Sequence, residues 1–221
     1  MYISIITIKG YEKALDMLLE SIPETFRNII IIYQNEENES VSVNEKDHII
    51  VKIRHNIYEY GSFIGLYRVF ELNLISEKEI ILLLHDTCKL GKKSIELSQQ
   101  LEDKIIRDYK SDILFISSKG SNNICFVNKT AINYGYNVYK DIYTIPKSLA
   151  IEWELNFYMY DQSMKALYVK RSFLDIEPEF KGRQKIYGDD VERDIVYFSV
   201  IDLEKYFYRV DLKQPYHPEK P

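Results

Sequence analysis

Residues 79–88, EIILLLHDTC, contain the most hydrophobic run of the sequence and decide the fold. Five apolar residues, 80–84, are followed directly by His85, Asp86 and Thr87. A continuous apolar run of this length is typical of a strand that is covered on both faces of a parallel sheet. The sequence therefore predicts a central strand at 80–84 with polar side chains at its carboxyl end.

Three shorter apolar runs precede this strand, and amphipathic segments lie between them. Strands are predicted at 3–8, 29–33 and 49–53, and a helix at about 63–74. An earlier helix is indicated by the spacing of Tyr11, Ala14, Leu15, Leu18, Leu19 and Ile22. A helix at about 95–105 and strands at 113–116 and 123–127 follow the central strand. This alternation predicts an α/β fold, with a doubly wound, mostly parallel central sheet flanked by helices.

The remaining segments show weaker patterns. Residues 34–47 carry five acidic residues and one lysine, and are predicted to be a solvated loop. Beyond about residue 146 we expect a helix at 147–160, followed by irregular Tyr/Phe-rich runs. Three prolines within 214–221 exclude a helix there. We expect one domain over 1–221, with a regular half at 1–130 and an irregular α+β half at 131–221.

Composition excludes several classes of protein. A net charge of -5, from 29 Lys+Arg and 34 Asp+Glu, argues against a duplex nucleic-acid binder that relies on neutralising phosphates. The two cysteines, Cys88 and Cys125, lie in or beside apolar runs and are predicted to be reduced thiols. No basic export signal opens the sequence, and no apolar stretch reaches the length of a membrane span. We therefore expect a cytoplasmic protein whose membrane contact is at most peripheral.

The chemistry is expected where the parallel strands end, because ligands of doubly wound sheets bind beyond the carboxyl ends of the strands. Asp86 offers a carboxylate there, which either holds a divalent cation that bridges a diphosphate or caps the next turn. The glycine patterns of dinucleotide-binding and P-loop sites are absent from the sequence, as are the HExxH and CxxC patterns of zinc sites.

Four segments occur in an order that resembles the nucleotide-sugar glycosyltransferases of GT-A fold, particularly the family-2-like bacterial enzymes of polysaccharide assembly. They are YISIITIKGYEKALDMLLESI (2–22), NIIIIYQN (28–35), HNIYEYGSFIGLYRVFE (55–71) and EIILLLHDTC (79–88). The resemblance covers about residues 1–130, and RQKIYGDDVERDIVYF (183–198) more loosely resembles the carboxyl-terminal part of some such enzymes. It implies a GT-A-like domain whose half at 1–130 binds the nucleotide sugar and whose half at 131–221 faces the acceptor.

The resemblance also implies roles for individual residues. Asn35 stands near the position where the family usually has an acidic residue that contacts uridine, and His85–Asp86–Thr87 stand at the DxD-type metal motif. Donor-binding residues are predicted at Thr7, Lys9, Asn35, Tyr60, Gly61, Arg68, His85, Asp86, Arg183, Lys185 and Arg193. Asp86 is predicted to hold Mn²⁺ or Mg²⁺, with His217 as a further ligand unless the tail is free.

Transfer of a sugar from such a donor needs positive charge near the departing diphosphate and a base for the acceptor hydroxyl. Arg183, Lys185 and Arg193 either close over the diphosphate or form a solvated surface of mixed charge. Glu154 is preferred over Glu152 as the base, and the alternative for both is an ordinary glutamate on a helix surface.

These expectations lead to a glycosyltransferase that moves a sugar, with inversion, from a UDP-type donor to a saccharide or lipid-linked acceptor. The main alternative is a GT-A-like domain that binds a nucleotide or glycan without turnover. A nucleotidyltransferase is a weaker alternative, because the segment ITIKGYEK lacks a glycine-rich signature loop. The 19 tyrosines are concentrated in the second half, where their flat faces suit stacking on sugar rings.

Overall fold

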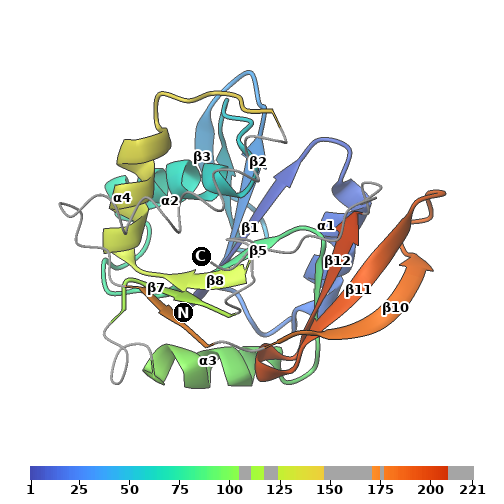
Figure 1. The fold of residues 1–221 in the computed structure, drawn as a ribbon. Helices are drawn as coiled ribbons and strands as arrows, with labels where there is room; N and C mark the ends of the chain where they lie inside the picture. Colours follow the sequence, from blue (N-terminus) through green and yellow to red (C-terminus); the bar gives the residue numbers. More distant parts are fainter. Residues whose placement is uncertain (105–110, 117–123, 147–170, 175–176, 209–221) are drawn as a thin grey trace, which may run out of the picture.

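The structure is a computed structural model that describes residues 1–104, 111–116, 124–146, 171–174 and 177–208. Its main feature is an eight-stranded sheet with helices on both faces, which confirms the predicted α/β fold (Figure 1). The strand order is β3-β4-β2-β1-β5-β8-β7-β9. The strands are β1 (Tyr2–Ile8), β2 (Ile29–Gln34), β3 (Ser40–Val43), β4 (Ile49–Lys52), β5 (Ile81–His85), β7 (Ile113–Phe115), β8 (Ile124–Val127) and β9 (Arg171–Phe173).

The centre of this sheet is parallel, and its strand order reverses once near the middle. Strands β4, β2, β1 and β5 are neighbours and all run in the same direction. From β1 the chain first builds outward through β2 to β4, and then returns to place β5 on the other side of β1. The reversal therefore lies between β1 and β5. Beyond β5, the strand β8 is antiparallel and ends the parallel block.

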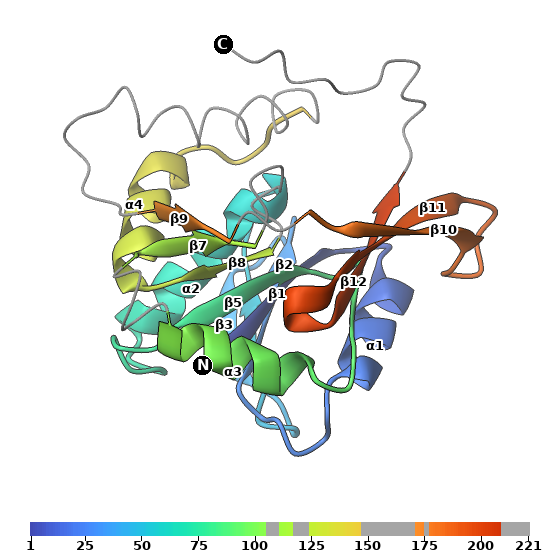
Figure 2. The ribbon, with the colours of Figure 1, turned by 60° about the horizontal axis from the view of Figure 1, so that its bottom comes forward.

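Two hydrophobic cores cover the two faces of the sheet. On one face lie α2 (Gly61–Glu71) and α4 (Lys129–Tyr139), and on the other lie α1 (Glu12–Ser21) and α3 (Ser94–Lys104) (Figures 1 and 2). The parallel strands are mostly apolar because most of their residues are buried from both sides. Apart from Ser4 in β1, their polar residues lie at the carboxyl ends of the strands.

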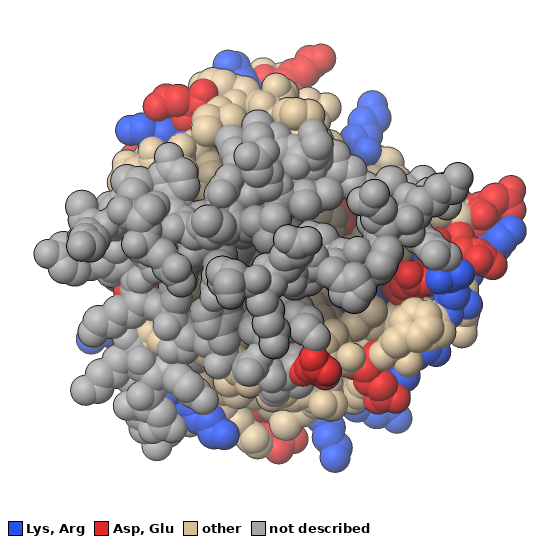
Figure 3. All heavy atoms as spheres, viewed as in Figure 1, with Lys and Arg blue, Asp and Glu red and all other residues tan. Residues whose placement is uncertain are grey.

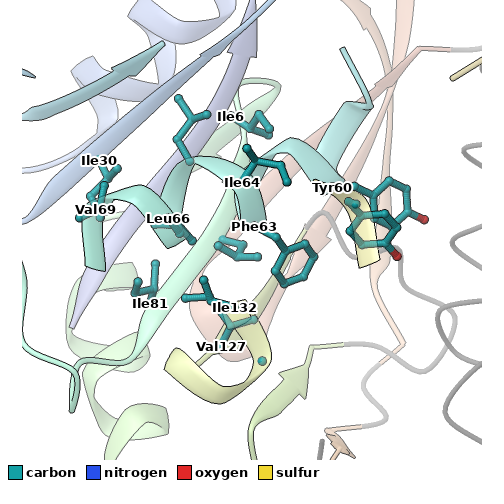
Figure 4. Packing of buried hydrophobic residues seen from close by; sticks show 14 of the residues in the cluster. Ile6, Ile30, Tyr60, Phe63, Ile64, Leu66, Val69, Ile81, Val127 and Ile132 are labelled. Carbon is teal, nitrogen blue, oxygen red and sulfur yellow. The ribbon is translucent and has the colours of Figure 1, made fainter. Parts of the chain in front are cut away.

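Glycines allow α2 to lie close to its neighbours. A Cβ atom on Gly65 would lie 2.7 Å from Cδ1 of Ile32 in β2, and a Cβ atom on Gly135 of α4 would lie 2.3 Å from the ring of Phe63. Figure 4 shows Phe63 at the centre of this core, beside Val127 and Ile132. Because Gly65 and Gly135 have no side chains, α2 can lie close to both β2 and α4.

A second sheet is attached where the first one ends. Its order is β10-β11-β12-β6, and all its pairings are antiparallel. The strands are β6 (Cys88–Leu90), β10 (Glu179–Lys185), β11 (Glu192–Phe198) and β12 (Leu203–Tyr208). Because only two residues separate the end of β5 from the start of β6, this sheet is anchored at the carboxyl edge of the large sheet. In Figure 2, β10 and β11 project away from the large sheet.

Several elements differ from the sequence-based expectations. Ser40–Val43 forms β3 inside the predicted loop, because its valines alternate and its backbone pairs with β4. Helix α4 was not expected from its aromatic-rich sequence. Its N-cap is Asn128, whose side chain accepts a hydrogen bond from the Ala131 N–H, and the helix is held by packing on α2. The carboxyl-terminal part, expected to be irregular, contains the regular strands β10, β11 and β12.

Three further expectations concern the cysteines, the membrane and one helix. Cys88 and Cys125 are buried free thiols, as predicted. Among the described residues, none of the helices has both the length and the apolar character that crossing a membrane requires. The helix predicted at 147–160 lies outside the described residues.

Candidate functional site

Asp86 lies at the point where the strand order reverses. It follows β5 directly, its N–H donates to the Ile6 carbonyl of β1 (3.1 Å), and its Oδ2 accepts from the Thr7 hydroxyl (2.8 Å). Both side chains are almost completely buried. The carboxyl ends of β1 and β5 are thereby joined across the switch point, which is where open α/β sheets bind their ligands.

His85 occupies the other side of the same carboxylate. Its Nδ1 lies 2.5 Å from Asp86 Oδ1, and it donates the hydrogen because an ionised carboxylate only accepts. The imidazole therefore has Nε2 as its second polar group, on a side chain that is 21% exposed. Both oxygens of Asp86 bond to neighbouring side chains in this way, which argues against the alternative that Asp86 caps the next turn.

The small sheet brings a cation to this turn. In the pairing of β12 with β6, Lys205 lies opposite Cys88, and the Tyr206 N–H donates to the Thr87 carbonyl (2.9 Å). The Lys205 ammonium donates to the Thr87 hydroxyl (2.7 Å), and only 4% of the residue is exposed. A buried positive charge thus lies against the residue that follows Asp86.

A second carboxylate approaches from the segment before α2. The side chain of Gln34, at the end of β2, accepts a hydrogen bond from the Ile57 N–H (3.1 Å) and so positions the short 3-10 helix Tyr58–Tyr60. Burial raises the pKa of the Glu59 carboxyl above 4.5, and its backbone N–H and the charges of His85 and Lys205 oppose this rise. Glu59 is therefore electrostatically coupled to the Asp86 region and keeps its proton to a higher pH than an exposed glutamate.

The raised pKa of Glu59 predicts a pH-dependent stability. The folded-state pKa of Glu59 is higher than the unfolded-state value of about 4.5. The free energy of unfolding is therefore largest, as far as this group is concerned, below about pH 4.5, and it falls as the pH rises through the folded-state pKa. We expect Glu59→Gln, which is neutral at every pH, to raise the thermal unfolding midpoint at pH 7–8 and to lose this advantage toward pH 4. The exposed Glu45→Gln is the control, with no such trend. Parallel curves for Glu59→Gln and the wild type would contradict the prediction.

Two of the predicted donor residues are closed in by the core. Tyr60 has no exposed surface, and its ring centroid lies 4.8 Å from that of Tyr139 (Figure 4 shows Tyr60). A ligand cannot reach this ring without displacing core side chains. Gly61 is buried at the start of α2, where a Cβ atom would lie 2.5 Å from Gln34 Oε1. Its structural role is to let α2 begin directly beside β2.

Three other predicted residues lie on or near the strand ends. Lys9 and Asn35 are exposed just beyond β1 and β2, at the same edge as Asp86. Asn35 has a left-handed backbone (φ 59°), and its N–H donates to the His55 carbonyl. Arg68 lies in the last turn of α2 and forms an ion pair with Glu39 (2.8 Å). The structure thus places Lys9 and Asn35 at the candidate site and gives Arg68 a carboxylate partner on the loop before β3.

The cations of the β10–β11 hairpin all have acidic partners. Arg183 pairs with Asp194 (2.7 Å) and Lys185 with Asp190 (2.9 Å). The buried Arg193 pairs with Asp189 (2.7 Å) and also lies 4.5 Å above the ring of Tyr187. Figure 3 shows acidic and basic side chains intermingled on the right, where the hairpin projects. These cations are neutralised locally in this conformation. The predicted Glu152, Glu154 and His217 lie outside the described residues.

Asp86 is the carboxylate of this turn that could hold a divalent cation. Mg²⁺ is usually bound by one or two carboxylates together with waters and substrate phosphates. Within the described ranges there is no group of three or more His, Cys, Asp or Glu side chains that could hold a metal ion. Both Asp86 oxygens already accept hydrogen bonds, and the side chain on Thr87 is an ammonium group. This turn therefore carries both a carboxylate and an ammonium group.

Comparisons with known proteins add likenesses of fold. No protein-family model matches the sequence, and no curated protein matches it. A glycosyltransferase involved in the glycosylation of the major capsid of PBCV-1 has a TM-score of 0.44 and 16% identity, over 79% of this chain and 83% of that chain. The apo-form glycosyltransferase GlyE of Streptococcus pneumoniae TIGR4 has a TM-score of 0.42 and 11% identity, over 77% of this chain.

A third solved structure is the galactosyltransferase LgtC in complex with donor and acceptor sugar analogs, with a TM-score of 0.35 and 12% identity over 70% of each chain. The chain spans less than half of the GlyE structure, with 44% of that protein covered. At these TM-scores and identities, no conclusion about chemistry rests on the likenesses.

Sequence reasoning missed two residues of the site, Glu59 and Lys205. Glu59 directly precedes Tyr60 and Gly61, so a carboxylate in that loop was a visible signal. Lys205 follows Leu203 by two residues in a strand, which places a charge on the same face as a fully buried leucine. That pattern is unusual, but it does not reveal that β12 pairs with β6.

Proposed function

We propose that this chain is a glycosyltransferase that moves a sugar from a nucleoside diphosphate donor to a saccharide or lipid-linked acceptor. The observation that carries the proposal is the hydrogen bond between Thr7 and Asp86 across the switch point of β1 and β5. This is the edge at which a doubly wound sheet binds its ligand. It is also where the sequence resemblance to the GT-A glycosyltransferases expects the diphosphate of the donor.

The exposed strand ends provide the rest of the donor site. Lys9 and Asn35 lie just beyond β1 and β2, within the same carboxyl edge as Asp86. We propose that they contact the nucleoside, of UDP type, while the diphosphate lies over the turn formed by His85, Asp86 and Thr87. His85 supports this arrangement, because its Nδ1 is held by Asp86 and its Nε2, which makes no hydrogen bond with the described residues, can accept one from a water or a sugar hydroxyl.

The reaction we propose is a direct displacement with inversion. The oxygen of the acceptor hydroxyl bonds to C1 of the donor sugar, and the bond from C1 to the β-phosphate oxygen breaks with its electron pair moving to the diphosphate. The hydroxyl proton goes to a carboxylate base, for which we propose Glu154, with Glu152 as the alternative. The acceptor belongs to polysaccharide or glycan assembly in the cytoplasm under this proposal, as the sequence resemblance implies.

Nucleotide binding tests the proposal directly. We expect UDP or another nucleoside diphosphate, at 100 times its dissociation constant, to stabilise the protein by about 2.7 kcal/mol. For a chain of this length, that gain raises the unfolding midpoint by about 5 to 10 °C. The measurement is thermal unfolding with UDP, GDP, ADP and CDP, each in EDTA and with Mn²⁺ or Mg²⁺. The absence of any shift would overturn the proposed function.

Turnover separates an enzyme from a binding domain. We expect slow release of sugar from the matching nucleotide sugar in the absence of acceptor, as water takes the place of the acceptor hydroxyl. Nucleotide binding without hydrolysis, and without transfer to any saccharide or lipid-linked acceptor, would instead identify a GT-A-like domain that binds its ligand without turnover.

A further inference from the structure

Lys205 is a buried lysine that forms no ion pair with the described residues, although its charge acts on the nearby carboxyl of Glu59. Its ammonium group makes a hydrogen bond with the neutral hydroxyl of Thr87, and no acidic side chain within the described ranges forms an ion pair with it. The residue is only 4% exposed. Burying a charge is costly unless an opposite charge or several hydrogen bonds compensate it. An ammonium group carries three donors, so this position is suited to an anionic ligand.

We propose that Lys205 performs the role that a divalent cation performs in metal-dependent glycosyltransferases, and binds the diphosphate of the donor. The proposal rests on the proposed function. The β6–β12 pairing holds the ammonium against Thr87, directly beyond Asp86, where charge accumulates on the leaving diphosphate. The contribution of Lys205 is electrostatic.

The first test needs only the wild-type protein. The dissociation constant of UDP, or of the nucleoside diphosphate that gives the largest thermal shift, is measured by titration calorimetry in EDTA and in Mn²⁺. We expect the two values to agree within about threefold. Binding that requires Mn²⁺ would overturn the role of Lys205 and leave the proposed function standing. Absence of binding in both buffers would overturn both.

The second test uses variants of one strand pair. We expect Lys205→Met to weaken nucleoside diphosphate binding by about 10- to 100-fold, because methionine removes the charge-assisted hydrogen bond. We expect Lys205→Arg to weaken binding less, because arginine keeps the positive charge. Binding of the nucleoside without phosphates should be unchanged in Lys205→Met, which also shows that the variant is folded. Lys89→Met, an exposed lysine of β6, is the matched control. Equal affinities of Lys205→Met and the wild type for the diphosphate would overturn the proposal.

Discussion

Asp86→Asn is expected to reduce donor hydrolysis and sugar transfer by about 10²- to 10³-fold, which is the usual cost of removing one preorganised electrostatic contact. Asparagine preserves the shape of the side chain, and its amide can still bond to Thr7 and to His85. The negative charge that makes the His85 hydrogen bond strong is lost. The imidazole is then held less firmly at the edge where the diphosphate departs.

The measurement for Asp86→Asn is the initial rate of nucleotide release at saturating donor, together with the thermal unfolding midpoint. We expect the rate to fall while the midpoint stays within a few degrees of the wild type. Asp47→Asn is the matched control, because Asp47 is an exposed aspartate in the turn before β4, at the opposite edge of the sheet. A rate for Asp86→Asn within threefold of the control would place the chemistry elsewhere.

Phe63→Ala is expected to destabilise the protein by about 3 to 5 kcal/mol, the largest effect on stability that we predict. The ring is 1% exposed and lies between α2, α4 and the sheet (Figure 4). The backbone of α4 at Gly135 touches it, so neighbouring atoms cannot easily fill the space that its removal leaves. The variant therefore loses the transfer free energy of the ring and also gains a cavity.

The chain offers a matched control in Phe180→Ala, the same substitution at a residue of β10 that is 60% exposed. Urea unfolding at 25 °C measures both variants, and we expect the control to change the free energy of unfolding by less than about 1 kcal/mol. Similar losses in the two variants would show that the α2–α4 interface is not the centre of the core.

The site was only partly predictable from the sequence. Thr7, His85 and Asp86 were identified because apolar runs mark strands, and the polar residues after them mark strand ends. Tyr60 illustrates the limit of this reasoning. Its place in the loop before a helix indicated a ligand contact, yet the structure packs its ring in the core against Tyr139. A single sequence shows that a tyrosine has both an apolar face and a hydroxyl, but not which neighbours surround it.

The sequence by itself determined the parallel sheet, because buried parallel strands require continuous apolar runs and helices require their own periodicity, and both are local patterns. Only the tertiary structure showed that a lysine lies at the site. Lys205 is 119 residues after Asp86 in the chain, and the pairing of β12 with β6 places it against Thr87. That pairing depends on hydrogen bonds between backbones, which carry no side-chain signature. The burial of Lys205 beside Thr87 can therefore be recognised only from the tertiary structure.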